Sequence, residues 1–210
     1  MVKFRFYALK LCLLMIGIFA LQIIFSGFTD MFVLNQSSYI EIWRFVTAVF
    51  LHGGLGHLAY NLFALALFGS ILEKLVGEKK FMFVFLVTGI LANLFSVNFY
   101  SSSLGASGAI FGVIGALIVV RPLMFVWAFG LPMPIFVAGI LWAVGDLIGA
   151  VAFFTGNSLD NIGNLAHLSG MVFGLIFGIL FRDWKFRKKR KSKAIFDEKS
   201  VRNWEDYYLR

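Results

Sequence analysis

Charged residues and cysteine are both scarce in this chain of 210 residues. Charged side chains make up 14% of it and apolar ones 60%, a balance outside the range of a soluble globule. The single cysteine, Cys12, lies within an apolar stretch, so neither a disulfide framework nor a thiol catalyst is indicated. The net charge of +8 gathers near the C-terminus, and nothing else favours nucleic-acid binding.

The sequence contains several long runs of apolar residues. Most are close to the roughly 20 residues that a helix needs to cross about 30 Å of hydrocarbon. They cover residues 11–28, 58–72, 81–99, 131–154 and 162–181, and a shorter run covers 107–120. We predict an all-α polytopic membrane protein with six transmembrane helices and a short central fourth helix. The first run lacks a small-residue cleavage site, so it is interpreted as a retained helix and not a signal peptide.

The positive charges predict the topology. With six spans and an internal N-terminus, 18 of the 19 Lys and Arg residues face the cytoplasm, and only Arg44 lies outside. The positive-inside rule therefore predicts a multi-pass cell-membrane protein with both termini cytoplasmic. The expected division is a membrane domain at 1–181 and a basic cytoplasmic tail at 182–210. The tail is interpreted as a topology anchor, with contact to anionic lipid headgroups as the alternative.

Polar residues gather in the outer leaflet of this arrangement. His52, His57 and Asn61 lie at the outer end of the second span, and Ser107 opens the fourth. His167 lies about five residues into the sixth span, so all three histidines of the chain share this depth. Polar groups inside a bilayer are costly and tend to mark function. Their convergence from three helices predicts a site.

The fourth span begins below the membrane surface. Its 14 residues rise only about 21 Å, so residues 99–106 must dip into the bilayer to meet it. Backbone at that depth is tolerated where it lines a water-filled cavity, which suits a hydrolase. Gly105 and Gly108 permit a tight turn around Ser107, and a helix N-terminus can stabilise an oxyanion. Taken alone, this segment favours an ordinary serine N-cap with glycines for packing.

Small residues on two spans favour catalysis instead. They recur at three- and four-residue spacing as Gly163, Ala166, Gly170, Gly174 and Gly178 on the sixth span, and as Gly108, Gly112, Gly115 and Ala116 on the fourth. Such faces let membrane helices approach with their backbones nearly touching. His167 lies beside this predicted seam at a depth close to Ser107, which is the arrangement that a base and its nucleophile need.

Five segments together resemble the rhomboid family. Residues 105–108, Gly-Ala-Ser-Gly, resemble its Gly-x-Ser-Gly motif, and residues 166–170 are similar to its Ala-His-x-x-Gly motif. The other three are the His-x4-His-x3-Asn pattern of His52, His57 and Asn61, the Trp43-Arg44 pair of the first external loop, and the acidic Glu73 near the inner end of helix two. They cover about residues 40–180 and resemble the minimal six-helix prokaryotic form.

The resemblance implies an intramembrane serine endopeptidase that cleaves transmembrane helices near their outer ends. Ser107 and His167 would form its catalytic dyad, and the Ser107 N–H, Asn61 and His57 its oxyanion hole. It implies no cofactor, no metal and no nucleic acid, with transmembrane proteins as substrates and the lipid bilayer as surroundings. Asp146, the only carboxylate well inside the fifth span, receives no catalytic role and is expected to make a structural hydrogen bond.

The remaining matched residues are expected to support the structure. These are Gly105, Gly108, Gly170, His52, Trp43, Arg44 and Glu73. His52 is expected to support its loop, Trp43 to anchor the interface, and Arg44 to pair with loop backbone or a lipid headgroup. Glu73 is expected to brace the inner end. The resemblance also implies lateral substrate access between the second and fifth helices, with Tyr60 and Trp142 as candidate gate residues.

Three other classes of function compete with this interpretation. A zinc hydrolase could use His52, His57 and His167 as ligands, but their spacing is not the His-Glu-x-x-His helix motif. A catalytically silent rhomboid relative that binds membrane helices is the main alternative, although such relatives usually lack the serine or the histidine. A transporter or channel would need charged or broken helices near the midplane.

Overall fold

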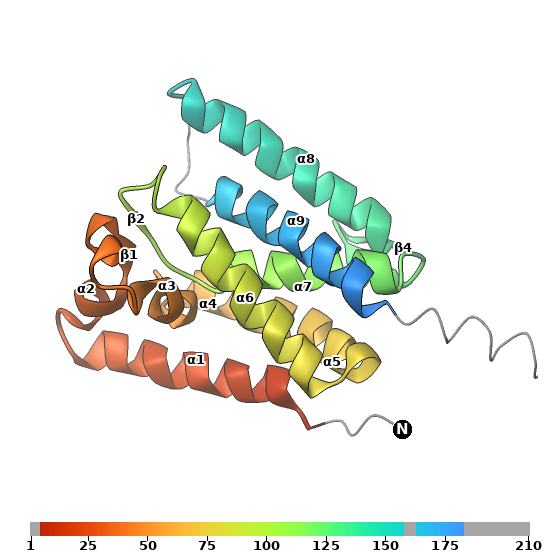
Figure 1. Cartoon of the computed structure of the whole chain (residues 1–210), viewed down its shortest axis with the longest axis horizontal. Coiled ribbons are helices and arrows are strands. Elements are labelled where there is room, and N and C mark those ends of the chain that lie inside the picture. The colour runs from red at the N-terminus through yellow and green to blue at the C-terminus, as the bar shows by residue number, and fades with distance from the viewer. Residues whose placement is uncertain (1–4, 158–162, 183–210) are drawn as a thin grey trace, which may run out of the picture.

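The computed structural model describes residues 5–157 and 163–182, and helices dominate it (Figure 1). The elements in chain order are α1 (Tyr7–Ile24), α2 (Phe28–Phe32), β1 (Leu34–Asn35), η1 (Gln36–Tyr39), α3 (Arg44–Thr47), η2 (Ala48–Phe50), α4 (Leu55–Ala64), η3 (Leu65–Gly69), α5 (Ser70–Val76), α6 (Glu78–Ser96), β2 (Ser102–Ser103), α7 (Ser107–Val120), β3 (Phe125–Ala128), β4 (Leu131–Pro134), α8 (Ile135–Phe154) and α9 (Asn164–Phe181).

Five helices of the described residues are long and apolar enough to cross a membrane. They are α1, the continuous helix Leu55–Val76 formed by α4, η3 and α5, then α6, α8 and α9. Each coincides within a few residues with one of the predicted long runs. The predicted short run is α7, a helix of 14 residues. The prediction of an all-α polytopic membrane protein is confirmed.

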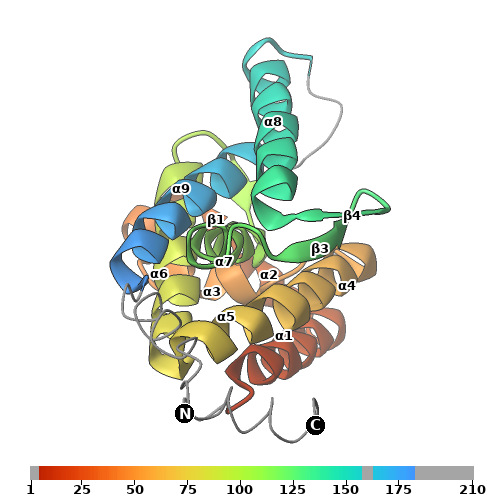
Figure 2. The same ribbon diagram turned by 90° about the vertical axis from the view of Figure 1, so that its right-hand side faces the viewer.

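The short helix α7 lies at the centre of the bundle. In Figure 2 it is seen nearly end-on, with α6, α9 and the α4–α5 helix around it. Most of its residues are buried, which is why its sequence is apolar on every face and not along one stripe only. The helix α8 stands at the edge of the bundle in the same view, and most of its residues are only partly buried or exposed.

The backbones of α7 and α9 meet along a seam of small residues. A β-carbon added to Gly170 would collide with the carbonyl oxygen of Gly108, and one added to Gly174 would collide with that of Gly112. In the opposite direction, a β-carbon on Gly115 would collide with the carbonyl oxygen of Met171. The predicted close approach of these two helices is confirmed, and it fixes how the N-terminal ends of α7 and α9 lie relative to one another.

One end of the bundle collects the basic residues at the helix termini. The start of α1, the junction of α5 with α6 and the end of α9 lie on the same side of Figure 1. Glu73, fully buried, accepts hydrogen bonds from the backbone N–H groups of Arg5 (3.2 Å) and Ala8 (3.1 Å) there. The Lys80 ammonium lies 5.3 Å from the Phe181 ring centroid.

The predicted tail beyond Arg182 falls outside the described residues, so its boundary and role stay predictions.

The segment before α7 makes backbone contacts with earlier parts of the chain, and the dip of residues 99–106 into the bilayer stays a prediction. Its strand β2 pairs in antiparallel fashion with β1, with Ser103 opposite Leu34. The Gly105 N–H then donates a 2.9 Å hydrogen bond to the Ala48 carbonyl. These backbone contacts hold the loop at two points, strand β2 and Gly105, so α7 starts at a defined position within the bundle.

A β-hairpin precedes α8 and corrects the predicted fifth span. Residues 131–134 were expected to belong to that span, but they form β4, which pairs with β3. Phe129 and Gly130 join the strands, both with positive φ (54° and 77°), as in two-residue hairpin turns. Pro132 and Pro134 lack the backbone N–H that a helix interior uses, so the helix begins only after Pro134.

Candidate active site

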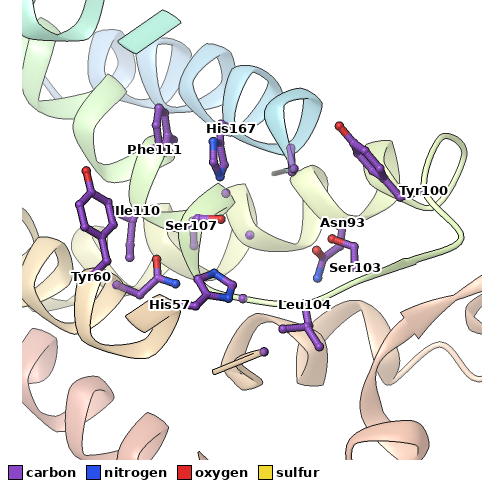
Figure 3. Close-up of a pocket in the computed structure, with 18 of the residues that line it drawn as sticks. His57, Tyr60, Asn93, Tyr100, Ser103, Leu104, Ser107, Ile110, Phe111 and His167 are labelled. Atoms are coloured by element: carbon purple, nitrogen blue, oxygen red, sulfur yellow. The ribbon is translucent and has the colours of Figure 1, made fainter. Parts of the chain in front are cut away.

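A cavity of about 1290 Å³ opens between α4, α7, α9 and the segment before α7 (Figure 3). Its lining includes the residues predicted for the dyad and the oxyanion hole, which are His57, Asn61, Ser107 and His167. Figure 3 shows the His167 ring extending from α9 towards Ser107, with His57 on the other side of the serine. Residues more than 100 positions apart in the chain are thus brought to one space.

Ser107 is the first residue of α7, and the position before it, Ala106, is the N-cap. The interpretation of Ser107 as an ordinary N-cap is therefore wrong, because Ala106 occupies the N-cap position of this helix. The Ile110 N–H donates to the Ala106 carbonyl at 2.9 Å, as the helical ladder begins. The N–H groups of Ser107 and Gly108 precede that ladder, so they are free of helical acceptors and lie at the positive end of the helix dipole.

His167 lies in the first turn of α9, which begins at Asn164 and not two residues earlier as the apolar run suggested. Its imidazole stacks on the Phe111 ring, with centroids 4.4 Å apart and planes 5° from parallel. Its Nδ1 lies 3.0 Å from Oδ1 of Asp146, which comes from α8. Within the described residues the imidazole forms no hydrogen bond to Ser107; such bonds are often long before substrate binds.

Asn61 and His57 both come from α4 and line the cavity opposite α9. The Asn61 side chain is 2% exposed, and its amide nitrogen has no hydrogen-bond partner among the described residues. A buried donor without a partner is costly unless something else accepts its hydrogen bond. This amide is therefore available to a group that enters the cavity.

Gly105 makes room for His57. Its φ is +122°, a conformation that other residues rarely adopt, and a β-carbon there would lie 2.7 Å from Cε1 of the His57 ring. Gly108 is similarly confined, because its β-carbon would lie 2.7 Å from that of Ala92. Both glycines around Ser107 are thus required by close contacts, one by the ring of a cavity residue and the other by a neighbouring helix.

Asp146 is the residue of this site whose contact could not be placed from the sequence. It is 8% exposed and is the only charged residue among the 20 of α8. It was expected to make a structural hydrogen bond, and the partner of that bond is His167 itself. The available signal was the isolated charge within an apolar span, which costs free energy unless it has a partner.

His52 lies behind the site and does not line the cavity. Its backbone N–H donates to Gln22 Oε1 at 3.0 Å, its carbonyl accepts from Gln22 Nε2 at 3.2 Å, and its ring centroid lies 5.1 Å from that of His57. Burial, with a smaller contribution from His57, lowers the pKa of His52 from 6.5 to about 4. His52 is therefore neutral near pH 7, and its ring contacts the site through the His57 ring.

Arg44 and Trp43 lie in the outer loop that the sequence pointed to. The buried Arg44 guanidinium donates to the carbonyls of Asp30 (2.7 Å) and Val33 (2.8 Å) and to Glu41 Oε2 (2.7 Å). Arg44 was expected to pair with loop backbone or with a lipid headgroup, and the structure shows the pairing with loop backbone. Trp43 precedes α3 with 48% of its surface exposed.

Metal-ligating side chains do not gather at the cavity. In residues 5–157 and 163–182, no three His, Cys, Asp or Glu side chains are placed to hold a metal ion. His52, His57 and His167, the ligands of the zinc alternative, therefore form no such group.

The fold and this site define a polytopic helical membrane protein with a serine and a histidine facing one interior cavity. A family model for the rhomboid domain matches residues 39–184, and the chain belongs to the rhomboid family. It is 33% identical over 139 residues to rhomboid protease GluP of Bacillus subtilis, covering 64% of this chain and 25% of GluP. It is 29% identical over 170 residues to rhomboid protease GlpG of Haemophilus influenzae, covering 77% of this chain and 83% of GlpG.

A plant relative gives a similar match. RHOMBOID-like protein 1 of Arabidopsis thaliana is 31% identical over 149 residues, which cover 67% of this chain and 35% of that protein. The chain thus spans about a quarter of GluP and a third of the Arabidopsis protein. The match to GlpG extends over most of both chains.

Proposed function

We propose that this chain is an intramembrane serine endopeptidase that cleaves transmembrane helices of other membrane proteins near their outer ends. Ser107 is the nucleophile and His167 its general base. The observation that carries the proposal is the placement of Ser107 at the start of α7, in one cavity with His167 and with the unpartnered Asn61 amide. The family and the rhomboid proteases among its relatives support the same reaction.

The proposed reaction follows from the chemistry of these groups. His167 accepts the Ser107 hydroxyl proton as Oγ attacks a peptide carbonyl carbon of the substrate. The tetrahedral intermediate collapses when His167 gives that proton to the leaving amine, and an acyl-enzyme remains. Water then attacks the ester with His167 again as the base, releasing the second product and restoring Ser107.

Three donors are available for the negative charge that develops on the carbonyl oxygen. They are the Ser107 N–H at the N-terminus of α7, the buried Asn61 amide and the His57 ring. Donors held in place before the reaction need no reorganisation, and each contributes about 3 kcal/mol to the lowering of the barrier in comparable sites. The positive end of the α7 dipole acts in the same direction.

Substrate is proposed to reach the cavity laterally, between the α4–α5 helix and α8. Tyr60 on α4 and Trp142 on α8 both line the cavity, and Tyr60 is 66% exposed. The Trp142 ring lies edge-on to Phe68, with centroids 6.0 Å apart, so an aromatic contact joins the two helices. Separating this contact would open a path for a substrate helix, and both residues are proposed as gate residues.

The proposed location is the cell membrane, with both termini cytoplasmic. The basic residues at the helix ends collect at the end of the bundle opposite Arg44, as the positive-inside rule requires for that orientation. The cavity then opens towards the outer leaflet. Labelling of single introduced cysteines from the two sides of intact cells would test this orientation.

The proposed activity is tested with a serine-directed fluorophosphonate probe on purified protein in detergent. Wild type should label, and Ser107→Ala and His167→Ala should not. Cleavage of a transmembrane reporter in liposomes, followed by mass spectrometry, should be lost in the same two variants. A folded wild type that neither labels nor cleaves would instead support the catalytically silent helix-binding relative, whose binding would survive in Ser107→Ala.

A further inference from the structure

The carboxylate of Asp146 is placed where it can control the catalytic imidazole. Asp146 lies in the interior of α8, and Oδ1 is 3.0 Å from Nδ1 of His167. The residue is 8% exposed, and Oδ2 has no partner among the described residues. A carboxylate in an apolar span costs free energy, so its presence needs a compensating role.

We propose that Asp146 is the positioning residue for His167, an inference that rests on the proposed function. A carboxylate can only accept a hydrogen bond, so the proton of the neutral imidazole is held on Nδ1. Nε2 then keeps its lone pair and is the nitrogen that can take the Ser107 proton. Asp146 thereby selects the tautomer in which His167 acts as a base.

The contact with Phe111 cannot provide this selection by itself. Stacking at 4.4 Å and 5° fixes the plane of the imidazole. A half-turn of the ring about its Cβ–Cγ bond keeps that plane but exchanges Nδ1 with Cδ2 and Nε2 with Cε1. Only a directional partner at the ring edge distinguishes the two orientations, and Asp146 is that partner. Plane and orientation are therefore fixed by different helices, α7 and α8.

Within residues 5–157 and 163–182, no other charged or titratable group at the ring replaces Asp146. His57 faces His167 from α4 across the cavity, and Ser107 faces it from α7. Neither supplies a carboxylate. In α9 itself no acidic residue is present, because its sequence from Asn164 to Phe181 carries no Asp or Glu. The hydrogen bond from α8 is therefore the contact that assigns the tautomer.

The tautomer can be read directly by NMR. The chain has three histidines, so protein labelled with ¹⁵N and ¹³C in the histidine rings gives three sets of ring signals. His52→Gln and His57→Gln variants assign the remaining set to His167. Wild type at neutral pH should show His167 protonated on Nδ1. In Asp146→Leu the proton should move to Nε2, because Nδ1–H would face an apolar side chain.

Kinetics give the second readout. Asp146→Leu should lower the rate of fluorophosphonate labelling and kcat on a transmembrane reporter by roughly 100-fold, with KM little changed, because general-base catalysis is lost and binding is not. Asp146→Glu, which restores a carboxylate, should recover part of kcat. Leucine suits a membrane span, so Asp146→Leu should fold, as a retained thermal midpoint would verify.

Ala150→Gly is the matched control. Ala150 lies four residues after Asp146 on the same face of α8 and is 3% exposed, so its loss loosens the helix without touching the carboxylate. It should leave the tautomer unchanged and lower kcat far less than Asp146→Leu. A wild-type His167 protonated on Nε2, or an unchanged tautomer in Asp146→Leu, would overturn the inference. An absence of labelling in wild type would instead count against the proposed protease, since the tautomer measurement needs no activity.

Discussion

The carbonyl oxygen of Gly108 on α7 occupies the space that a β-carbon on Gly170 of α9 would need. Gly108 follows Ser107 in the chain, and Gly170 lies one helical turn after His167. One of the close backbone contacts of the seam thus lies beside the two proposed catalytic residues. Any side chain introduced there acts as a spacer between nucleophile and base.

Gly170→Ala should therefore reduce both stability and activity. The added methyl collides with backbone, which cannot rotate away, so the free energy of unfolding should fall by about 1–3 kcal/mol. Labelling of Ser107 should fall in parallel, since α7 and α9 are pushed apart. The control is Gly17→Ala in α1, where nothing lies within 4 Å of the added carbon, and its thermal midpoint should be unchanged or slightly higher. Equal midpoints for the two variants would contradict the seam.

Gly105→Ala tests the loop that leads into α7. The substitution places a methyl 2.7 Å from the His57 ring on a backbone with φ of +122°, so the ring must shift or the turn must change. We expect kcat to fall at least about tenfold, because His57 and Ser107 lose their relative placement. Gly56→Ala, in a position open to space, should keep wild-type kinetics. Near-normal activity of Gly105→Ala would show that the His57 ring position does not matter.

Asn61 and Asn93 form a natural pair for separating catalysis from stability. Both line the cavity, but the Asn93 amide donates to the Phe45 carbonyl at 2.9 Å, whereas the Asn61 amide nitrogen has no partner among the described residues. Asn61→Ala should lower kcat by about 100-fold with an unchanged thermal midpoint. Asn93→Ala should mainly lower the free energy of unfolding, by about 1–3 kcal/mol. The reverse pattern would remove Asn61 from the oxyanion hole.

The stability of the protein should fall in acid partly through His52. Folding lowers the pKa of this imidazole from its ordinary value of 6.5 to about 4, so the unfolded chain takes up a proton that the folded chain resists. The stabilisation is complete above pH 6.5 and is lost as the pH falls towards about 4. His52→Gln has no such proton, so its thermal midpoint should decline less steeply over this interval. Parallel curves for the two proteins would contradict a lowered pKa.

The sequence predicted most of the architecture because bilayer spans carry a strong signal. Runs of apolar residues located the five long helices that the structure describes, and the short run at 107–120 coincides with α7. The predicted start of the fifth span was wrong because Leu131 and Met133 are as apolar as the residues of the helix that follows, α8. Their alternation with Pro132 and Pro134 is typical of an extended strand.

The sequence singled out residues that line the cavity, but not the contacts that these residues make. Small residues at regular spacing in membrane helices predict that the helices pack closely. The seam of glycines therefore predicted that Ser107 and His167 lie close together at a similar depth. The hydrogen bond between Asp146 and His167 depends instead on how far α8 is rotated about its axis. That rotation is set by tertiary packing and by the hairpin before it, which hydropathy does not report.

The shortness of α7 has a consequence for the choice of the bond that is cut. With 14 residues, this helix rises about 21 Å and holds Ser107 at a fixed depth between the two faces of the bundle. For the proposed protease, successive residues of a substrate helix differ in depth by about 1.5 Å, so position along the membrane normal selects the scissile bond. Both the depth of a peptide bond in the membrane and the side chains around it would then select the site of cleavage. A thicker bilayer would shift the cleavage site along an otherwise identical substrate.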